Sequence, residues 1–116
     1  MKRDYRDYLK DILTAIDESA EFTREMTFDA FMHDKKTINA VVRSLEVIGE
    51  AAKNIPEDLR SKAAEIPWKY MAGMRDKLIH EYFGVDLSIV WTVIHSELPP
   101  LRPGIERLLA MQGNGT

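Results

Sequence analysis

Apolar residues recur at intervals of three and four along almost the whole chain, and charged residues occupy most of the positions between them. This spacing places apolar side chains on one face of an α-helix, whereas a half-buried β-strand needs strict alternation. We find no convincing stretch of alternation in the sequence. The pattern therefore predicts an all-α fold, an antiparallel up-and-down bundle of about four or five helices.

Residues that start or stop helices bound these elements. Asp4 and Asp86 are suited to cap helix N-termini, and Pro99-Pro100 is suited to break a helix. A loop is expected over about residues 26–34. Helices are thus predicted over about residues 4–23, 34–54, 67–83, 87–98 and 101–111, with a short one after Pro56.

The size and composition of the chain predict a single domain. With 116 residues, 45% of them hydrophobic, it can bury a core without disulfides or a structural metal. We expect this domain to span residues 1–112 and a flexible tail to span residues 113–116. The side chains expected to face the core are Tyr5, Leu9, Ile12, Ile16, Ala20, Ile38, Val41, Leu45, Ile48, Ala52, Ile55, Leu87, Val90, Trp91, Ile94, Leu98, Leu101, Ile105, Leu108 and Leu109.

Composition and charge exclude several classes of function. The chain has no cysteine, which excludes disulfides, thiolate zinc sites and cysteine nucleophiles and fits a reducing compartment. It shows neither a secretory signal nor a run of about 20 apolar residues, so we expect a cytoplasmic protein that does not enter a membrane. The net charge of −3 argues against a nonspecific nucleic-acid coat. Any nucleic-acid site must be local, with a second subunit or a partner supplying part of it.

Arg75 occupies an unusual place on the third long helix. At about 100° per residue, it falls on the same stripe as Met71, Met74 and Leu78, which is the natural core face. A buried charge is costly unless it is paired or solvated. Arg75 therefore pairs with a carboxylate such as Glu50, lies at the open end of the bundle, or faces a cleft that binds an anion.

His80 is the other candidate for chemistry on this helix. It lies one turn after Asp76, which can orient its ring, and close to a predicted helix C-terminus. Both features are expected to raise the pKa of His80 toward neutrality or above. A histidine and an arginine together suit RNA cleavage, since the imidazole moves a proton and the guanidinium holds the phosphate. Five residues separate them by about 140° around the helix, which favours a site completed by a second copy.

Residues 74–86 resemble the signature of HEPN-domain toxins of the HepT family. The motif is an arginine, a polar residue, three further residues, a histidine, any residue and a tyrosine, here Arg75, His80 and Tyr82. Residues 37–52, with Ile-Gly-Glu-Ala near their end, are similar to the second helix of the family. The resemblance covers nearly the whole chain apart from the tail.

This resemblance implies a helical-bundle homodimer that acts as a metal-independent endoribonuclease toxin. Arg75 and His80 from both subunits would line a cleft at the interface, and Asp76 would support them. The family is paired with a minimal, MntA-like nucleotidyltransferase antitoxin, which would attach AMP to Tyr82 and block RNA by charge and bulk. No cofactor and no metal are implied. The alternative is a noncatalytic HEPN module that dimerises and binds a nucleotidyltransferase.

Other candidate residues have simpler interpretations. His33 and His95 lack a partner at metal-ligand spacing and are taken as incidental. Gly49 predicts a close helix crossing, and Gly73 a similar crossing at the dimer contact. A polar stripe at helical spacing on the second helix predicts an ion-paired, solvated face: Arg43, Glu46, Glu50 and Lys53.

Overall fold

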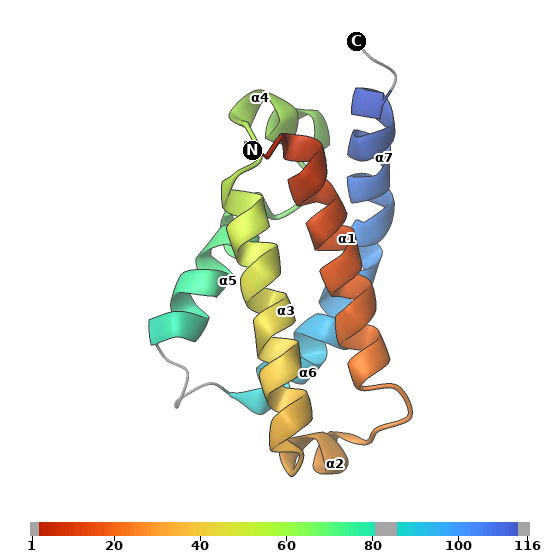
Figure 1. Ribbon diagram of the computed structural model, residues 1–116, viewed down its shortest axis with the longest axis vertical. Helices are drawn as coiled ribbons and strands as arrows, with labels where there is room; N and C mark the ends of the chain where they lie inside the picture. Colours follow the sequence, from red (N-terminus) through yellow and green to blue (C-terminus); the bar gives the residue numbers. More distant parts are fainter. Residues whose placement is uncertain (1–2, 81–85, 114–116) are drawn as a thin grey trace.

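The main helices pack side by side around α3. The computed structural model describes residues 3–80 and 86–113, with the backbone alone at positions 75, 77–80, 112 and 113. Helix α3 lies between α1 and α5, and α7 packs against α1 (Figure 1). The predicted all-α bundle is confirmed. Its main helices are α1 (Tyr5–Phe22), α3 (Lys35–Lys53), α5 (Trp68–His80) and α7 (Arg102–Gly113).

Two aspartates begin the two longest helices. The Asp4 carboxylate accepts a hydrogen bond from the backbone N–H of Arg6 at 2.6 Å, and Asp7 reaches back to the N–H of Asp4 at 3.3 Å. At the start of α3, Asp34 accepts from the backbone N–H of Thr37 at 3.1 Å. These side chains satisfy N–H groups that have no partner within the helix. The predicted cap of α1 is confirmed, and α3 starts where the sequence indicates.

The connection between α1 and α3 holds a short helix that the sequence analysis missed. Residues 26–34 were predicted as a loop, but α2 (Phe28–Met32) lies within them. The Thr27 hydroxyl caps it by accepting from the N–H of Ala30 at 3.1 Å, and Phe31 is fully buried. A helix of little more than one turn is too short to show a periodic pattern, so the prediction was wrong here.

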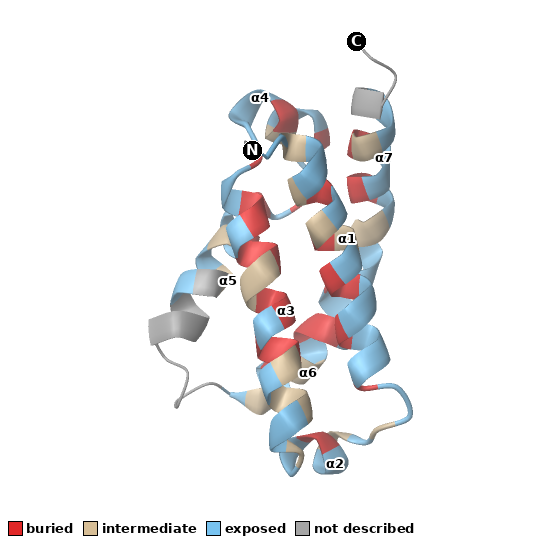
Figure 2. Ribbon diagram, viewed as in Figure 1, coloured by how far each residue is buried: buried red, intermediate tan, exposed pale blue. Residues whose placement is uncertain are grey.

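The core is one cluster of buried side chains from α1, α3, α5, α7 and residues 90–98 (Figure 2). Most of the predicted core residues are buried. Six others are only partly buried against the core: Tyr5, Ile38, Leu87, Trp91, Leu101 and Leu109. Ala20, by contrast, is exposed. Its neighbour Ser19 is fully buried instead. The Ser19 hydroxyl tolerates that place because it donates a hydrogen bond to the carbonyl of Ile16 at 3.0 Å. The stripe on α1 is therefore shifted by one residue at its end.

The proline pair changes the winding of the helix that precedes it. Helix α6 (Leu87–Thr92), capped by Asp86, continues as a π-turn, η3 (Val93–Glu97), and a 3₁₀ turn, η4 (Pro99–Leu101). The N–H of Leu98 donates to the carbonyl of Val93, five residues back, at 2.9 Å. A single helix broken or kinked at the prolines was predicted, whereas the structure absorbs the disruption within a wider turn.

Ion pairs fasten α7 to the rest of the bundle. Arg102 donates from Nε and Nη2 to both carboxylate oxygens of Asp17 on α1, at 2.9 and 2.7 Å. This hydrogen bonding to Arg102 lowers the pKa of Asp17.

None of the described helices has both the length and the apolar character that crossing a bilayer requires.

Candidate active site

Helix α5 is held against α3 by large apolar side chains in its first turns. Trp68 is 5% exposed, and its indole N–H donates to the carbonyl of Ala63 in η1 (Ser61–Ala63) at 3.1 Å. Met71 is fully buried, and Met74 is partly buried against the core. Because these residues are three or four positions apart, they define one face of α5. That face packs on α3.

The two residues proposed for chemistry sit at different angles on α5. Arg75 follows Met71 by four residues, so its position lies on the stripe that faces α3. His80 is the last residue of α5, about 140° around the helix from position 75 and about 7.5 Å along it. The prediction that the motif begins on a helix is confirmed. Tyr82 lies outside the described residues, and so do the side-chain contacts of Arg75 and His80.

Asp76 is the motif residue whose side chain the structure describes. It is exposed, and its Oδ1 lies 3.5 Å from Nζ of Lys53 in the last turn of α3. In the sequence, Lys53 belongs to a polar stripe that predicts a solvated face, and this contact with Asp76 was not predicted. The available signal was the place of Lys53 at the end of the helix that neighbours the motif. Spacing along one helix does not reveal such a contact between two helices.

The C-terminus of α3 is capped by an arginine from α4 (Glu57–Arg60). Arg60 donates from Nε to the carbonyl of Ile55 at 2.9 Å and from Nη2 to the carbonyl of Ala52 at 2.8 Å. It thereby adds a donor to the carbonyl of Ala52 in the last turn of α3 and one to the carbonyl of Ile55 just beyond it. Arg60 therefore ties α4 to the end of α3.

The outer face of α5 differs from the face that packs on α3. A Cβ atom built at Gly73 would meet nothing within 4 Å, and Tyr70 is 52% exposed. Partial burial raises the pKa of Tyr70, and the nearby carboxylate of Glu97 adds to this effect. Position 73 lies seven residues before His80 and therefore on the same side of the helix. The described part of the chain thus gives no packing reason for a glycine at position 73.

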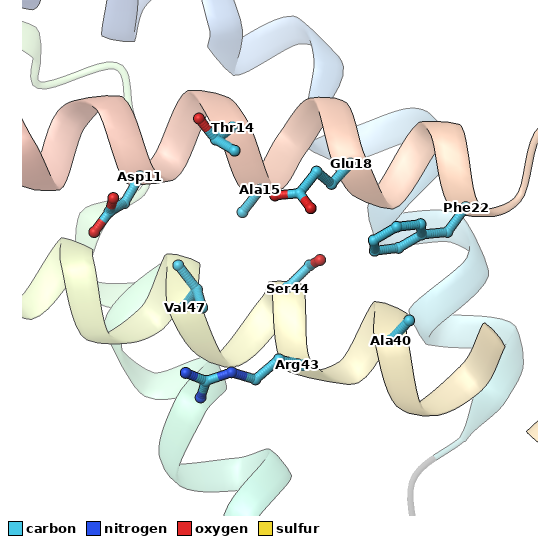
Figure 3. A pocket seen from close by; sticks show the side chains of 9 residues that line it. All are labelled: Asp11, Thr14, Ala15, Glu18, Phe22, Ala40, Arg43, Ser44 and Val47. Atoms are coloured by element: carbon cyan, nitrogen blue, oxygen red, sulfur yellow. The ribbon is translucent and has the colours of Figure 1, made fainter. Parts of the chain in front are cut away.

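A groove between α1 and α3 is a second candidate for binding (Figure 3). It has a volume of about 330 Å³ and is lined mainly by small and apolar side chains, with Arg43 on one wall. Asp11 and Glu18 face it from α1, so carboxylates outnumber the single guanidinium. This charge balance is unfavourable for a nucleic-acid phosphate. The groove is therefore a poor place for RNA cleavage.

The two remaining histidines have structural contacts. Nε2 of His95 lies 2.8 Å from the hydroxyl of Thr23, and its Nδ1 lies 2.9 Å from the carbonyl of Trp91. The ring also packs on Trp91, with the ring centroids 4.1 Å apart. His33 bonds locally through Nδ1 to the carbonyl of Asp29 at 2.8 Å. His95 therefore joins α1 to η3 and is more than incidental, which corrects the sequence interpretation.

Comparison with known proteins places this arrangement in a family. The family model described as "Ribonuclease HepT-like" matches residues 12–108. A protein of Thermococcus cleftensis named "Probable ribonuclease HepT" is 54% identical over 108 residues, covering 93% of this chain and 98% of its own length. A "Putative RNase" of Methanocaldococcus jannaschii is 50% identical, covering 93% and 89%.

The similarity extends to a bacterial relative. A "Putative RNase" of Caldanaerobacter subterraneus subsp. tengcongensis is 46% identical over 104 residues, covering 90% of this chain and 93% of its own length. No solved structure matches the chain. The family model covers most of the bundle and all of α5, the helix that carries Arg75, Asp76 and His80. The chain belongs to the family of HepT-like ribonucleases.

Proposed function

We propose that this chain is a metal-independent endoribonuclease whose site is built on α5. The observation that carries the proposal is the family match over residues 12–108, which includes Arg75 and His80 on one helix. The Arg75 guanidinium would bind the scissile phosphate and neutralise the charge that develops on it. The His80 imidazole would take the proton of the attacking 2′-hydroxyl or give one to the departing oxygen. Asp76, one turn before, would orient the ring.

The site is proposed to be shared between two copies of the chain. Positions 75 and 80 point about 140° apart on a straight helix, so the two side chains of one copy converge poorly. Gly73 supports the same idea, because a glycine within a helix costs about 1 kcal/mol relative to alanine. Its open outer face lets another helix approach closely on the side of His80. A homodimer formed along α5 would bring Arg75 and His80 of different subunits together.

The proposed biological role is that of a toxin in a toxin–antitoxin pair. A minimal nucleotidyltransferase would serve as the antitoxin and transfer AMP to the hydroxyl of Tyr82. The transfer forms a P–O bond to the tyrosine oxygen and releases pyrophosphate from ATP. The added phosphate and nucleoside would block the RNA site through negative charge and bulk.

Cleavage assays with single variants test the enzymatic proposal. We expect the wild-type chain to cleave RNA in the presence of EDTA and to arrest growth when expressed alone. Arg75→Ala and His80→Ala should each lower cleavage at least about 100-fold, because each removes a group that acts in the transition state. Arg24→Ala and His33→Ala are matched controls, since both residues are exposed and lie away from α5. Intact RNA with the wild-type protein would instead favour a noncatalytic HEPN module.

Mass spectrometry tests the proposed regulation. Co-expression with a minimal nucleotidyltransferase of the proposed antitoxin type should add one or more AMP units to the wild-type chain and suppress its activity. Tyr82→Phe should remain unmodified, whereas Tyr70→Phe, a change at an exposed tyrosine on α5, should be modified normally. AMP on the Tyr82→Phe protein would refute the assignment of the modified residue.

A further inference from the structure

Lys53 joins the end of α3 to the motif on α5. Its ammonium lies 3.5 Å from Oδ1 of Asp76, and the two side chains are 43% and 54% exposed. The pair therefore lies at the surface, where a salt bridge contributes little to the stability of the fold. Yet it links two helices that pack closely, and its acidic member is four residues before His80. The contact of Lys53 with Asp76 can therefore matter for the position of Asp76 even though it adds little to the stability of the fold.

Lys53 is not needed to cap α3. A lysine in the last turn of a helix commonly interacts with the terminal carbonyl groups. Here Arg60 donates to the carbonyls of Ala52 and Ile55, and the Asn54 amide donates to the carbonyl of Glu50 at 2.9 Å. Two carbonyls in the last turn of α3, those of Glu50 and Ala52, thus have donors from other side chains. The Lys53 ammonium extends instead to the carboxylate on α5.

We propose that Lys53 is a positioning residue of the RNA-cleavage site, acting on His80 through the carboxylate of Asp76. The inference rests on the proposed function and adds to it a residue from a second helix. On α5, residues four apart lie on the same side, so Asp76 is within reach of His80. The same carboxylate is held from α3 by Lys53. Lys53 thereby restricts the rotamers of Asp76 and partly balances its charge.

This role predicts which kinetic constant changes when Lys53 is replaced. Lys53→Met should lower kcat about three- to tenfold and leave KM within about twofold, because the effect reaches the chemical step through Asp76. Lys53→Arg should keep most of the wild-type kcat, since arginine can pair with the same carboxylate. Lys36→Met, the same change at the other end of α3, is the matched control and should behave like wild type.

A double-mutant cycle with Asp76 separates positioning from direct binding of RNA. In the Asp76→Asn background, Lys53→Met should have no further effect on kcat, because the carboxylate through which it acts is gone. If Lys53 instead held an RNA phosphate, Lys53→Met would raise KM and make RNA binding less dependent on salt, in both the wild-type and the Asp76→Asn backgrounds. That outcome, or wild-type kinetics for Lys53→Met, would overturn the inference.

A spectroscopic measurement tests the inference without RNA. The ring proton and carbon shifts of His80, recorded by NMR, should move in Lys53→Met, stay near wild type in Lys53→Arg, and be insensitive to Lys53→Met once Asp76 is asparagine. Unchanged His80 shifts in Lys53→Met would contradict the positioning role. If the wild-type protein left RNA intact, the proposed function would fail while this measurement still decided whether Lys53 acts on His80.

Discussion

Thr23 shows how much a single small side chain contributes to this bundle. It is 2% exposed at the end of α1, its hydroxyl contacts the carbonyl of Ser19 at 3.1 Å, and it lies 2.8 Å from Nε2 of His95. Thr23→Val keeps the shape but removes both hydrogen bonds of the hydroxyl. We expect the free energy of unfolding to fall by about 1–2 kcal/mol, measured by urea denaturation. Thr14→Val, at an exposed threonine on α1, should change it by less than about 0.5 kcal/mol.

Residue-level chemistry could be predicted where it depends on spacing along one helix. Arg75, Asp76 and His80 were found because motif and periodicity place them together in the sequence. Lys53 was missed because its contact with Asp76 joins positions far apart in the chain. Ala20 was predicted to be buried because it lies at the edge of the apolar stripe. A periodic pattern locates such an edge only to within about one residue.

At the scale of the elements, side chains that cap the helix N-termini help to set where each helix begins. The contribution of such a cap can be tested at Asp34, which precedes α3. The Asp34 carboxylate accepts a hydrogen bond from the backbone N–H of Thr37, which lowers the pKa of Asp34. The stabilisation is thus present above its unfolded pKa of about 3.9 and is lost as the pH falls through the lower folded value. Asp34→Ala should lower the Tm at pH 7 by about 5 °C. Asp34→Asn, which caps without a charge, should lower it less.

Circular dichroism melts across pH decide this point. The difference in Tm between wild type and Asp34→Ala should shrink as the pH falls from about 5 toward 2, because the wild-type carboxyl becomes protonated. Asp34→Asn should lose less stability than wild type over the same range. A difference in Tm that stays constant with pH would show that the negative charge of Asp34 contributes nothing to the cap. The start of α3 near residue 34 could be predicted, since a strong periodic pattern follows, but Asp34 was not singled out as its cap.

Two elements could not be predicted from their local sequence. Helix α2 depends on Phe31 being buried against the bundle, which is a tertiary contact. The π-turn over Val93–Glu97 depends on how the chain accommodates the two following prolines while keeping Val93 and Ile94 in the core. The prolines indicate that the helix is disturbed there. They do not indicate whether the chain kinks, ends or widens its turn.

At the scale of the whole molecule, the shared site makes a prediction about mixtures. Arg75→Ala and His80→Ala proteins are each expected to be inactive alone. After subunits exchange, a mixed dimer would hold one site with Arg75 from one copy and His80 from the other. Equal mixing should therefore restore about a quarter of wild-type activity, since half the dimers are mixed and each has one intact site. Mixtures as inactive as the single variants would place the site within one copy.

The bundle could be predicted from the sequence far better than the assembly. Apolar periodicity sets the helices of one chain, because burial of one face is the main requirement for each. The outer face of α5 has no comparable signature: a glycine, an exposed tyrosine and charged residues suit either solvent or a polar subunit contact. Only the poor convergence of Arg75 and His80 on one helix indicates a second subunit.

Helix α5 contacts the described part of the bundle mainly through α3, whereas α1 packs against both α3 and α7 (Figure 1). The backbone amides of α5 should therefore exchange with deuterium through local opening, at a lower free energy than the amides of α1 and α3. Contact with a second copy along the outer face would slow this exchange as the protein concentration rises. The exchange rate of a single helix would then measure how tightly two copies of the chain associate.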